Sequence, residues 1–393
     1  MAQAIKSARS LGAITSDLSS LIRAFLAIFC AGALYGWSAL APSLQSRFDT
    51  STAEVGFVFS IAIVSFTVAV LVAPRLVKRF NEVAVMGVSA LLATVWVGLA
   101  AVAWSFPMFL LCFSLGFGFA SGSIYSTALR VGASGARPWL TTPMMVAGFG
   151  LGGVVFSAIW TTLVARDWGI SALAVLAVAL FLTALFRFIP RGAVHRASDA
   201  VEINRPETPP AFQRPTVILW GIFALGSFSG LMVLGLAGSV LEQAEAGVAL
   251  TAFVLAGVAM GNTLGRFSAA LTRGASPTVA LVASVALNLA GLGLALGNTA
   301  PLWVGLSLIT IALGYGLMAS AVPLATSYVF GAERFQAAFG IIFTAWGLSG
   351  FAAPWLAGRL FDLSGSFTPG FTVAIIMTLG TLPLIFLLDR ARP

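Results

Sequence analysis

Charged residues are scarce in this chain of 393 residues. Asp, Glu, Lys and Arg together make up 9% of it, whereas hydrophobic residues make up 59% and the mean hydropathy is +1.01. Soluble globular domains carry about 25% charged residues, so the composition excludes that class. The chain is therefore predicted to be an integral membrane protein.

Residues that assemble catalytic or metal centres are also rare. The single histidine, His195, lies in a polar segment, and the two cysteines, Cys30 and Cys112, lie in apolar runs where burial is expected. All thirteen acidic residues lie in termini, loops or the ends of predicted helices. Because no buried cluster of such side chains can form a metal site or a nucleophile triad, we expect neither an enzyme nor a cofactor.

Long apolar runs make up most of the remaining sequence. Runs of about 20 residues, enough to cross a hydrocarbon core of ~30 Å as a helix, recur about twelve times. A membrane β-barrel would instead show alternating segments of about 10 residues. The polar first segment does not resemble a removable signal peptide. The predicted transmembrane helices are 23–45, 54–74, 84–104, 107–129, 139–164, 169–189, 216–239, 248–271, 277–296, 301–323, 336–358 and 370–388.

Positive charge is distributed unevenly over the predicted loops. If both termini are cytoplasmic, Arg47, Arg166 and Arg359 are the three basic residues outside, and the other eighteen of 21 lie inside. This bias predicts cytoplasmic termini in a multi-pass protein of the cell membrane, surrounded by lipid. It also explains the net charge of +8 without a nucleic-acid partner, because short loops offer no clustered basic surface. We expect the protein to be monomeric.

The chain divides into two similar halves. A segment rich in charge and proline, 191–215, is predicted to be a cytoplasmic linker between the six-helix bundles 1–190 and 216–393. The halves match at an offset of about 195–198 residues, as in GFGFASGSIYSTALRVGA (116–133) and GYGLMASAVPLATSYVFGA (314–332). Because six is even, both copies enter the membrane from the same side, which predicts two parallel repeats with a cleft between them.

Three further segments carry a family resemblance. They are LYGWSALAPSL (34–44), PWLTTPMMVAGFGLGG (138–153) and FGIIFTAWGLSGFAAPWLAGRLFDLSGSFTPGF (339–371). With them the chain resembles the major facilitator superfamily over nearly its whole length, and within it the branch of the oxalate/formate antiporter and the monocarboxylate transporters. The resemblance implies an all-α fold of twelve transmembrane helices and secondary transport by alternating access.

The loop between the second and third predicted helices departs from the signature of that superfamily. In PRLVKRFN (74–81), Lys78 and Asn81 stand where the family usually has an aspartate and a glycine. The gating role of that aspartate is therefore not carried over to this chain.

One arginine, Arg266, interrupts the eighth predicted helix. It precedes Arg273 by seven residues, which places it about 10 Å below the cytoplasmic surface. Its side chain could extend to the inner interface or pair with a loop. However, the repeat has no charge at the equivalent position between Val68 and Leu71, so the architecture alone does not require one. A charge inside the membrane that faces a cleft indicates a functional site.

The family resemblance implies that Arg266 holds the carboxylate of the substrate. A planar guanidinium suits a carboxylate better than lysine does. Monocarboxylate carriers place an aspartate for proton coupling one turn earlier, where this chain has Asn262, which cannot titrate. The antiporter has a second cation, a lysine, where this chain has Trp346. A single buried cation favours a monoanion with an apolar or aromatic body over a small dicarboxylate.

Aromatic and hydroxyl-bearing side chains complete the predicted site. Tyrosine hydroxyls can donate to a carboxylate while aromatic rings enclose the rest of the ligand. For Tyr35, Tyr125 and Trp346, the resemblance adds that matching segments line the pocket of the antiporter. The predicted substrate-binding residues are Arg266, Asn262, Tyr35, Trp37, Tyr125, Phe149, Tyr315 and Trp346.

The predicted function is transport of a small organic anion, with a monocarboxylate as the first candidate. The main alternative is an exporter of drugs or other hydrophobic molecules, although proton-coupled exporters usually carry acids within the membrane. Sugar carriers need several Asn and Gln side chains, and these helices offer little beyond Asn262 and Asn288. A channel would need a continuous polar path, and a transporter-like receptor would need a further domain. Exchange, uniport and cation-coupled symport stay open.

Overall fold

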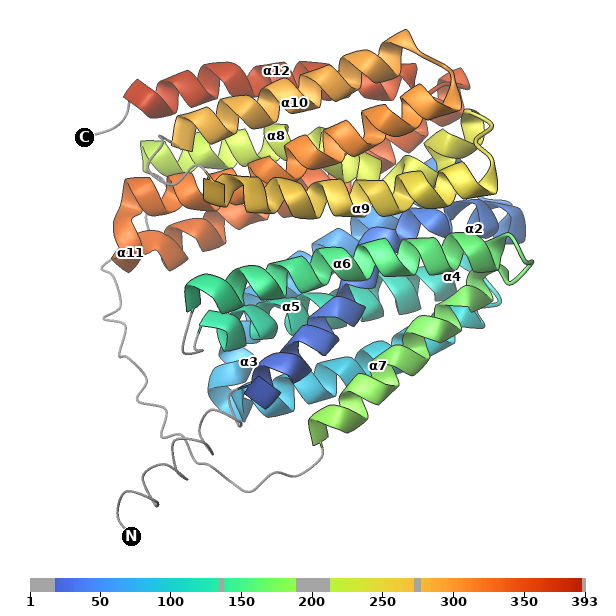
Figure 1. Ribbon diagram of the computed structural model, residues 1–393, viewed down its shortest axis with the longest axis horizontal. Helices are drawn as coiled ribbons and strands as arrows, with labels where there is room; N and C mark the ends of the chain where they lie inside the picture. The colour runs from blue at the N-terminus through green and yellow to red at the C-terminus, as the bar shows by residue number, and fades with distance from the viewer. Residues whose placement is uncertain (1–17, 134–137, 189–212, 272–276, 391–393) are drawn as a thin grey trace.

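Long helices make up almost all of the structure (Figure 1). The computed structural model describes residues 18–133, 138–188, 213–271 and 277–390, and these contain no strand. After a helix over residues 18–31, the elements are η1 (Gly32–Ala39), α2 (Ala41–Phe48), α3 (Thr52–Ala101), α4 (Phe106–Phe109), η2 (Leu110–Phe117), α5 (Gly118–Ala133), α6 (Pro138–Val164), η3 (Gly169–Ala172), α7 (Leu173–Phe188), α8 (Arg214–Gln243), α9 (Val248–Leu271), α10 (Pro277–Gly297), α11 (Pro301–Ser364) and α12 (Thr368–Arg390).

Two of these helices are too long for a single membrane crossing. α3 has 50 residues and α11 has 64, which corresponds to about 75 and 96 Å against a hydrocarbon core of ~30 Å. Each is interrupted by one non-helical residue, Asn81 in α3 and Gly331 in α11. Among the described residues, eleven stretches are long and apolar enough to span a membrane, and one of them, Thr52–Ala101, holds two crossings. The predicted all-α fold of twelve transmembrane helices is confirmed.

Several helices extend beyond their predicted ends. The sequence predicts ends at 74 and 323, yet the helices continue to Asn81 and Gly331. Pro74 and Pro323 lie inside the helices and do not end them, because neighbouring helices in a membrane protein can satisfy the freed backbone groups. The first helix is also shorter than predicted, since it changes to 3₁₀ geometry at Gly32 and α2 begins after it.

Asn81 lies at the turn between two crossings, where the backbone has a conformation typical of glycine. Its φ of 64° and ψ of 166° lie in a region that side chains other than glycine rarely adopt. The Asn81 Oδ1 atom accepts a hydrogen bond of 3.0 Å from the backbone N–H of Ala84. The side chain therefore caps the second part of α3, which helps to offset the strained backbone.

The helices form two groups in space. In Figure 1, the helices from the first half of the chain (blue to green) lie below those from the second half (yellow to red). The groups pack closely where glycines remove side chains: a Cβ at Gly56 would overlap Pro354, and one at Gly238 would overlap Ser38. The predicted linker lies mostly outside the described residues, and its last two positions belong to α8, which begins at Arg214.

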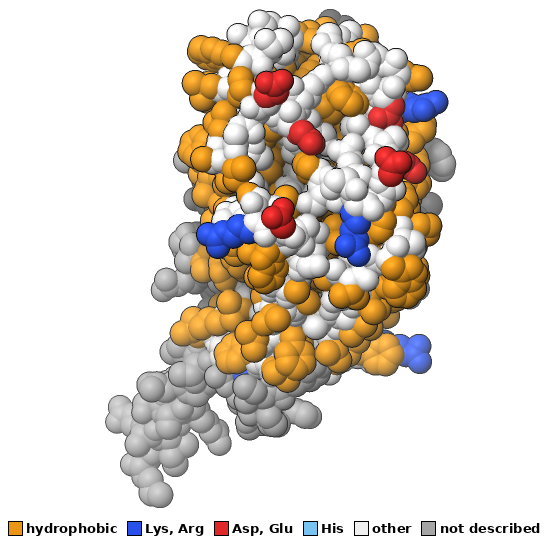
Figure 2. Space-filling model, turned by 90° about the vertical axis from the view of Figure 1, so that its right-hand side faces the viewer, with side chains coloured by type: hydrophobic (Ala, Val, Ile, Leu, Met, Phe, Trp, Pro, Cys, Tyr) orange, Lys and Arg blue, Asp and Glu red, His pale blue; other side chains and the backbone are white. Residues whose placement is uncertain are grey.

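The two ends of the molecule differ in charge. At the end where α2 and α4 lie, here called the α2 end (right in Figure 1), Figure 2 shows acidic side chains on the surface. The acidic residues of the helix ends and loops that meet there are Asp49, Glu54, Asp167, Glu242, Glu245 and Asp362. The opposite end, here called the Gly331 end, carries basic residues of which the described ones include Arg75, Lys78, Arg79, Arg130, Arg214 and Arg334.

A carboxylate joins the two helix groups at the α2 end. Asp362, near the end of α11, accepts hydrogen bonds of 2.9 Å from the backbone N–H groups of Thr52 and of Ala53. These N–H groups lie in the first turn of α3, where they have no partner within the helix and carry partial positive charge. Asp362 therefore caps a helix of the other group and holds this end closed.

We predict that Asp362→Ala destabilises the closed end. The substitution leaves two backbone donors without an acceptor, and loss of such a cap costs about 1 kcal/mol. The purified protein in detergent should unfold at a lower temperature, which tryptophan fluorescence can follow. Asp167→Asn is the control, because Asp167 is exposed at a φ of 64° that asparagine also tolerates. Equal midpoints for Asp362→Ala and the unmodified protein would contradict the capping role.

Candidate functional site

Arg266 lies between the two helix groups. Its Nε atom donates a hydrogen bond of 2.8 Å to Oδ1 of Asn262, one turn earlier on α9, and its Nη2 atom donates one of 3.1 Å to the hydroxyl of Tyr35. Tyr35 belongs to η1, in the other helix group. The guanidinium therefore points across the boundary between the groups, and it does not extend toward the membrane surface.

Three of the four tyrosines in the chain meet at this arginine. Tyr125 of α5 and Tyr315 of α11 are electrostatic neighbours of the guanidinium, and Tyr315 is also a neighbour of Tyr35. The hydroxyl of Tyr315, on α11, also accepts a hydrogen bond of 2.6 Å from Nε1 of Trp346. Polar side chains from separate helices of both groups thus gather in one place, here called the network.

Aromatic rings enclose the network. The ring of Phe149 on α6 lies edge-on to Tyr35, with centroids 4.8 Å apart, and to Tyr125, with centroids 5.1 Å apart. The ring of Phe66 on α3 lies 5.4 Å from that of Tyr125, 5.8 Å from that of Phe149 and 5.7 Å from that of Trp346. Phe66 is missing from the predicted site, because nothing in the sequence distinguishes it from the other members of a set of 31 phenylalanines.

Trp37 lies outside this cluster. It is fully buried, and its ring packs against those of Phe109 and Phe113, with centroids 5.9 and 5.0 Å away. Because Tyr35 and Trp37 are two residues apart on a helix, their side chains point in different directions. The structure brings the other six predicted residues together around Arg266, whereas Trp37 belongs to the core of the first helix group.

Two polar groups of the network, the Arg266 guanidinium and the Asn262 amide, are not fully paired. Among the side chains that the structure describes, no carboxylate forms an ion pair with Arg266. The ion pair found in the described residues joins Arg130 to Glu82, at 3.6 Å, away from this site. The Nδ2 atom of Asn262, a side chain that is only 1% exposed, has no hydrogen-bond partner. Buried charges and buried donors are costly when unpaired, so an anion with acceptor oxygens would stabilise both.

Glycines position the aromatic side chains. A Cβ at Gly230 of α8 would overlap the ring of Tyr315, and one at Gly32 would overlap the backbone of Phe149. A glycine of α6 also contacts the other helix group, because a Cβ at Gly150 would overlap Thr263 of α9. The close approach of α6 and α9 places Tyr35 within hydrogen-bond reach of Arg266.

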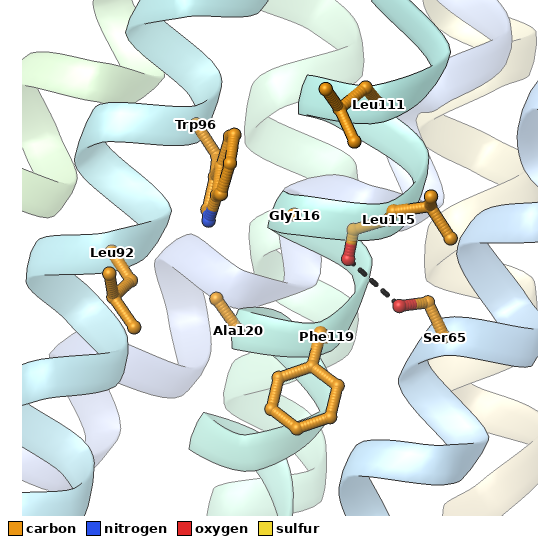
Figure 3. Close-up of a pocket in the computed structure, with 8 residues that line it drawn as sticks. All are labelled: Ser65, Leu92, Trp96, Leu111, Leu115, Gly116, Phe119 and Ala120. Carbon is orange, nitrogen blue, oxygen red and sulfur yellow. Dashed lines mark hydrogen bonds between the residues drawn. The ribbon is translucent and has the colours of Figure 1, made fainter.

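A separate hollow lies on the outer face of the first helix group (Figure 3). It has a volume of about 350 Å³. Leu92, Leu111 and Leu115 are each about half exposed there, so the hollow opens outward and does not lead to Arg266. Ser65 donates a hydrogen bond of 2.8 Å to the carbonyl of Leu115, within the π-helical segment η2. The lining residues are Ser65, Leu92, Trp96, Leu111, Leu115, Gly116, Phe119 and Ala120.

The fold and this site define a class of protein. Twelve membrane helices in two groups, with a charged network between them, are typical of a secondary transporter. The family model of the Major Facilitator Superfamily matches residues 24–354, and the chain belongs to that family. It is therefore a multi-pass membrane transporter rather than an enzyme.

Known relatives agree with this assignment. The uncharacterized MFS-type transporter YhjX of Escherichia coli (strain K12) is 24% identical over 345 residues, which cover 84% of each chain. The nucleoside transporter NupG is similar in structure, with a TM-score of 0.74 and 15% identity over 94% of this chain and 99% of that one. A D-xylose-proton symporter is also similar in structure, with a TM-score of 0.74 and 16% identity over 96% of this chain and 98% of that one. At these identities the solved structures show the fold alone.

We predict that Gly230→Ala disturbs the network. The added methyl group forces the Tyr315 ring to move and weakens its hydrogen bond with Trp346, so the free energy of unfolding should fall by about 1–3 kcal/mol, as overpacking usually causes. Chemical denaturation of the purified protein measures this free energy of unfolding. Gly293→Ala on α10 is the matched control, because a Cβ there meets nothing within 4 Å. The network interpretation is wrong if both variants unfold alike.

Proposed function

We propose that the protein carries a small organic anion, in the first place a monocarboxylate, across the membrane by alternating access. The observation that supports this most is the position of Arg266, a cation between two helix groups whose hydrogen bonds go to neutral side chains. A bound carboxylate would supply the missing negative charge. The same reasoning favours the branch of oxalate/formate antiporters and monocarboxylate transporters within the superfamily.

The donors of the site fit a carboxylate. Arginine has five N–H donors, of which Asn262 and Tyr35 engage only some, so that others stay available to a carboxylate. The unpartnered Nδ2 of Asn262 adds a further donor one turn away on α9. Because the site contains one cation, a monoanion matches its charge better than a dianion does.

The contacts between the helix groups support a mechanism in which the two groups move relative to each other. At the α2 end the groups are joined by Asp362 and by glycine contacts, while Arg266 and Tyr125 remain partly exposed. We infer that the two bundles, residues 1–190 and 216–393, rock about the site, and that the bonds of Asp362 break when the α2 end opens. The excess of basic residues at the Gly331 end supports its assignment, with both termini, to the cytoplasmic side of the cell membrane.

An exporter of drugs or other hydrophobic molecules is the second candidate. The rings of Phe66, Phe149 and Trp346 favour it, because they would also enclose an uncharged apolar compound. The two functions differ in their need for a cation. A neutral cargo does not require Arg266, whereas a carboxylate does.

We predict that Arg266→Ala abolishes uptake of monocarboxylates by protein in liposomes. Removal of one partner of a buried charge pair costs about 2–5 kcal/mol, which corresponds to a loss of roughly 30-fold to several thousand-fold. Arg266→Lys should also fail, because lysine lacks the planar pair of donors. Radiolabelled acetate, butanoate and benzoate are suitable probes.

Arg214→Ala is the control for this experiment, since Arg214 is exposed at the start of α8 and uptake should not change. Undiminished transport of a monocarboxylate by Arg266→Ala would contradict the proposal. Transport of a neutral amide, benzamide, in preference to benzoate would favour the exporter.

A further inference from the structure

A row of aromatic side chains leads along α11 to the site. The rings of Phe335 and Phe339 are stacked with centroids 5.3 Å apart, those of Phe339 and Phe343 are 5.8 Å apart, and those of Phe343 and Trp346 are stacked at 5.1 Å. Trp346 then contacts Phe66 and hydrogen-bonds Tyr315. The row is continuous from the Gly331 end to the network of Arg266.

The row faces the interior of the molecule. On α11, Leu348 and Trp355 are 51% and 41% exposed, which marks the side of the helix that faces lipid. At ~100° per residue, they point about 180° and 160° away from Phe339. Phe335, Phe343 and Trp346 lie within about 40° of Phe339, so the row lies on the side opposite the lipid.

The row is nevertheless only half-buried at one end. Phe335, Phe339 and Phe343 keep part of their surface accessible, whereas Trp346 is 3% exposed and Ala353 and Ala357, further along the same face, are almost fully buried. Because this face is turned away from lipid, the accessible surface faces the interior of the molecule. It is present at the Gly331 end and ends at Trp346.

We propose that the phenylalanine row on α11 lines the entrance to the site and selects carboxylates with an aromatic body. The inference rests on the proposed function, because Arg266 must hold the carboxylate. A flat ring can stack on Phe335, Phe339 and Phe343 in turn and then on Trp346 and Phe66, with its carboxylate directed at Arg266. Phe335, Phe339 and Phe343 act on specificity, since they contact the body of the ligand and not its charged group.

Matched acids test this proposal. Benzoate and cyclohexanecarboxylate are both monoanions with a six-membered ring, and only benzoate is aromatic. Aromatic pairs contribute beyond apolar burial, so we expect kcat/KM for benzoate uptake to exceed that for cyclohexanecarboxylate by about three- to tenfold. Phe339→Leu, which keeps an apolar side chain but removes the ring, should reduce this preference to about one while uptake of cyclohexanecarboxylate persists.

Phe253→Leu is the matched control, because Phe253 on α9 is 66% exposed and the ring contacts of the row do not involve it. This variant should keep the preference for benzoate.

Phe343→Leu provides a second variant should Phe339→Leu fold poorly. Equal uptake of both acids by the unmodified protein, or an unchanged preference in both variants, would overturn the selective role. If Arg266→Ala still removes uptake of both acids, only this inference fails and the proposed function stands. Lack of uptake of either acid would count against the inference as well.

Discussion

The structure depends on a guanidinium that stays charged inside the membrane without a carboxylate from the described part of the chain. The hydrogen bonds from Arg266 to Asn262 and to Tyr35 reduce the cost of burying this charge, but they do not neutralise it. Because Tyr35 comes from the first helix group and Arg266 from the second, the bond between them connects the two groups. A ligand that binds here would therefore act on the contact between the two groups that we propose to move.

Packing explains how these side chains reach one another. Gly150 lets α6 approach α9 at Thr263, and Gly230 makes room for the ring of Tyr315. Small residues are needed at such places because lipid offers no hydrophobic force to hold helices together. At the α2 end, Asp362 adds a polar contact that is specific to one arrangement of the groups. A cap of this kind can be broken and reformed, as the proposed alternating access requires.

Much of the fold and the centre of the site could be predicted from the sequence. The apolar runs that cross the membrane and the spacing of Arg266 and Asn262 are local properties, so they are found again in the structure, although several helix ends differ. The direction of Trp37 and the contribution of Phe66 depend on how separate helices pack. The sequence of an apolar run does not indicate which of its residues face another helix. The bond between Asp362 and α3 joins residues about 310 positions apart, and an acidic residue at a helix end resembles any other. Pro74 and Pro323 were misleading because membrane neighbours tolerate a proline inside a helix.

The most direct test of this account is an experimental structure of the protein with a bound monocarboxylate such as benzoate. The account predicts the carboxylate within ~3 Å of the Arg266 guanidinium, as expected for a charge-assisted hydrogen bond, with the ring between Phe66 and Trp346. A structure in which benzoate binds elsewhere, while Arg266 is paired with a carboxylate of the chain itself, would contradict it.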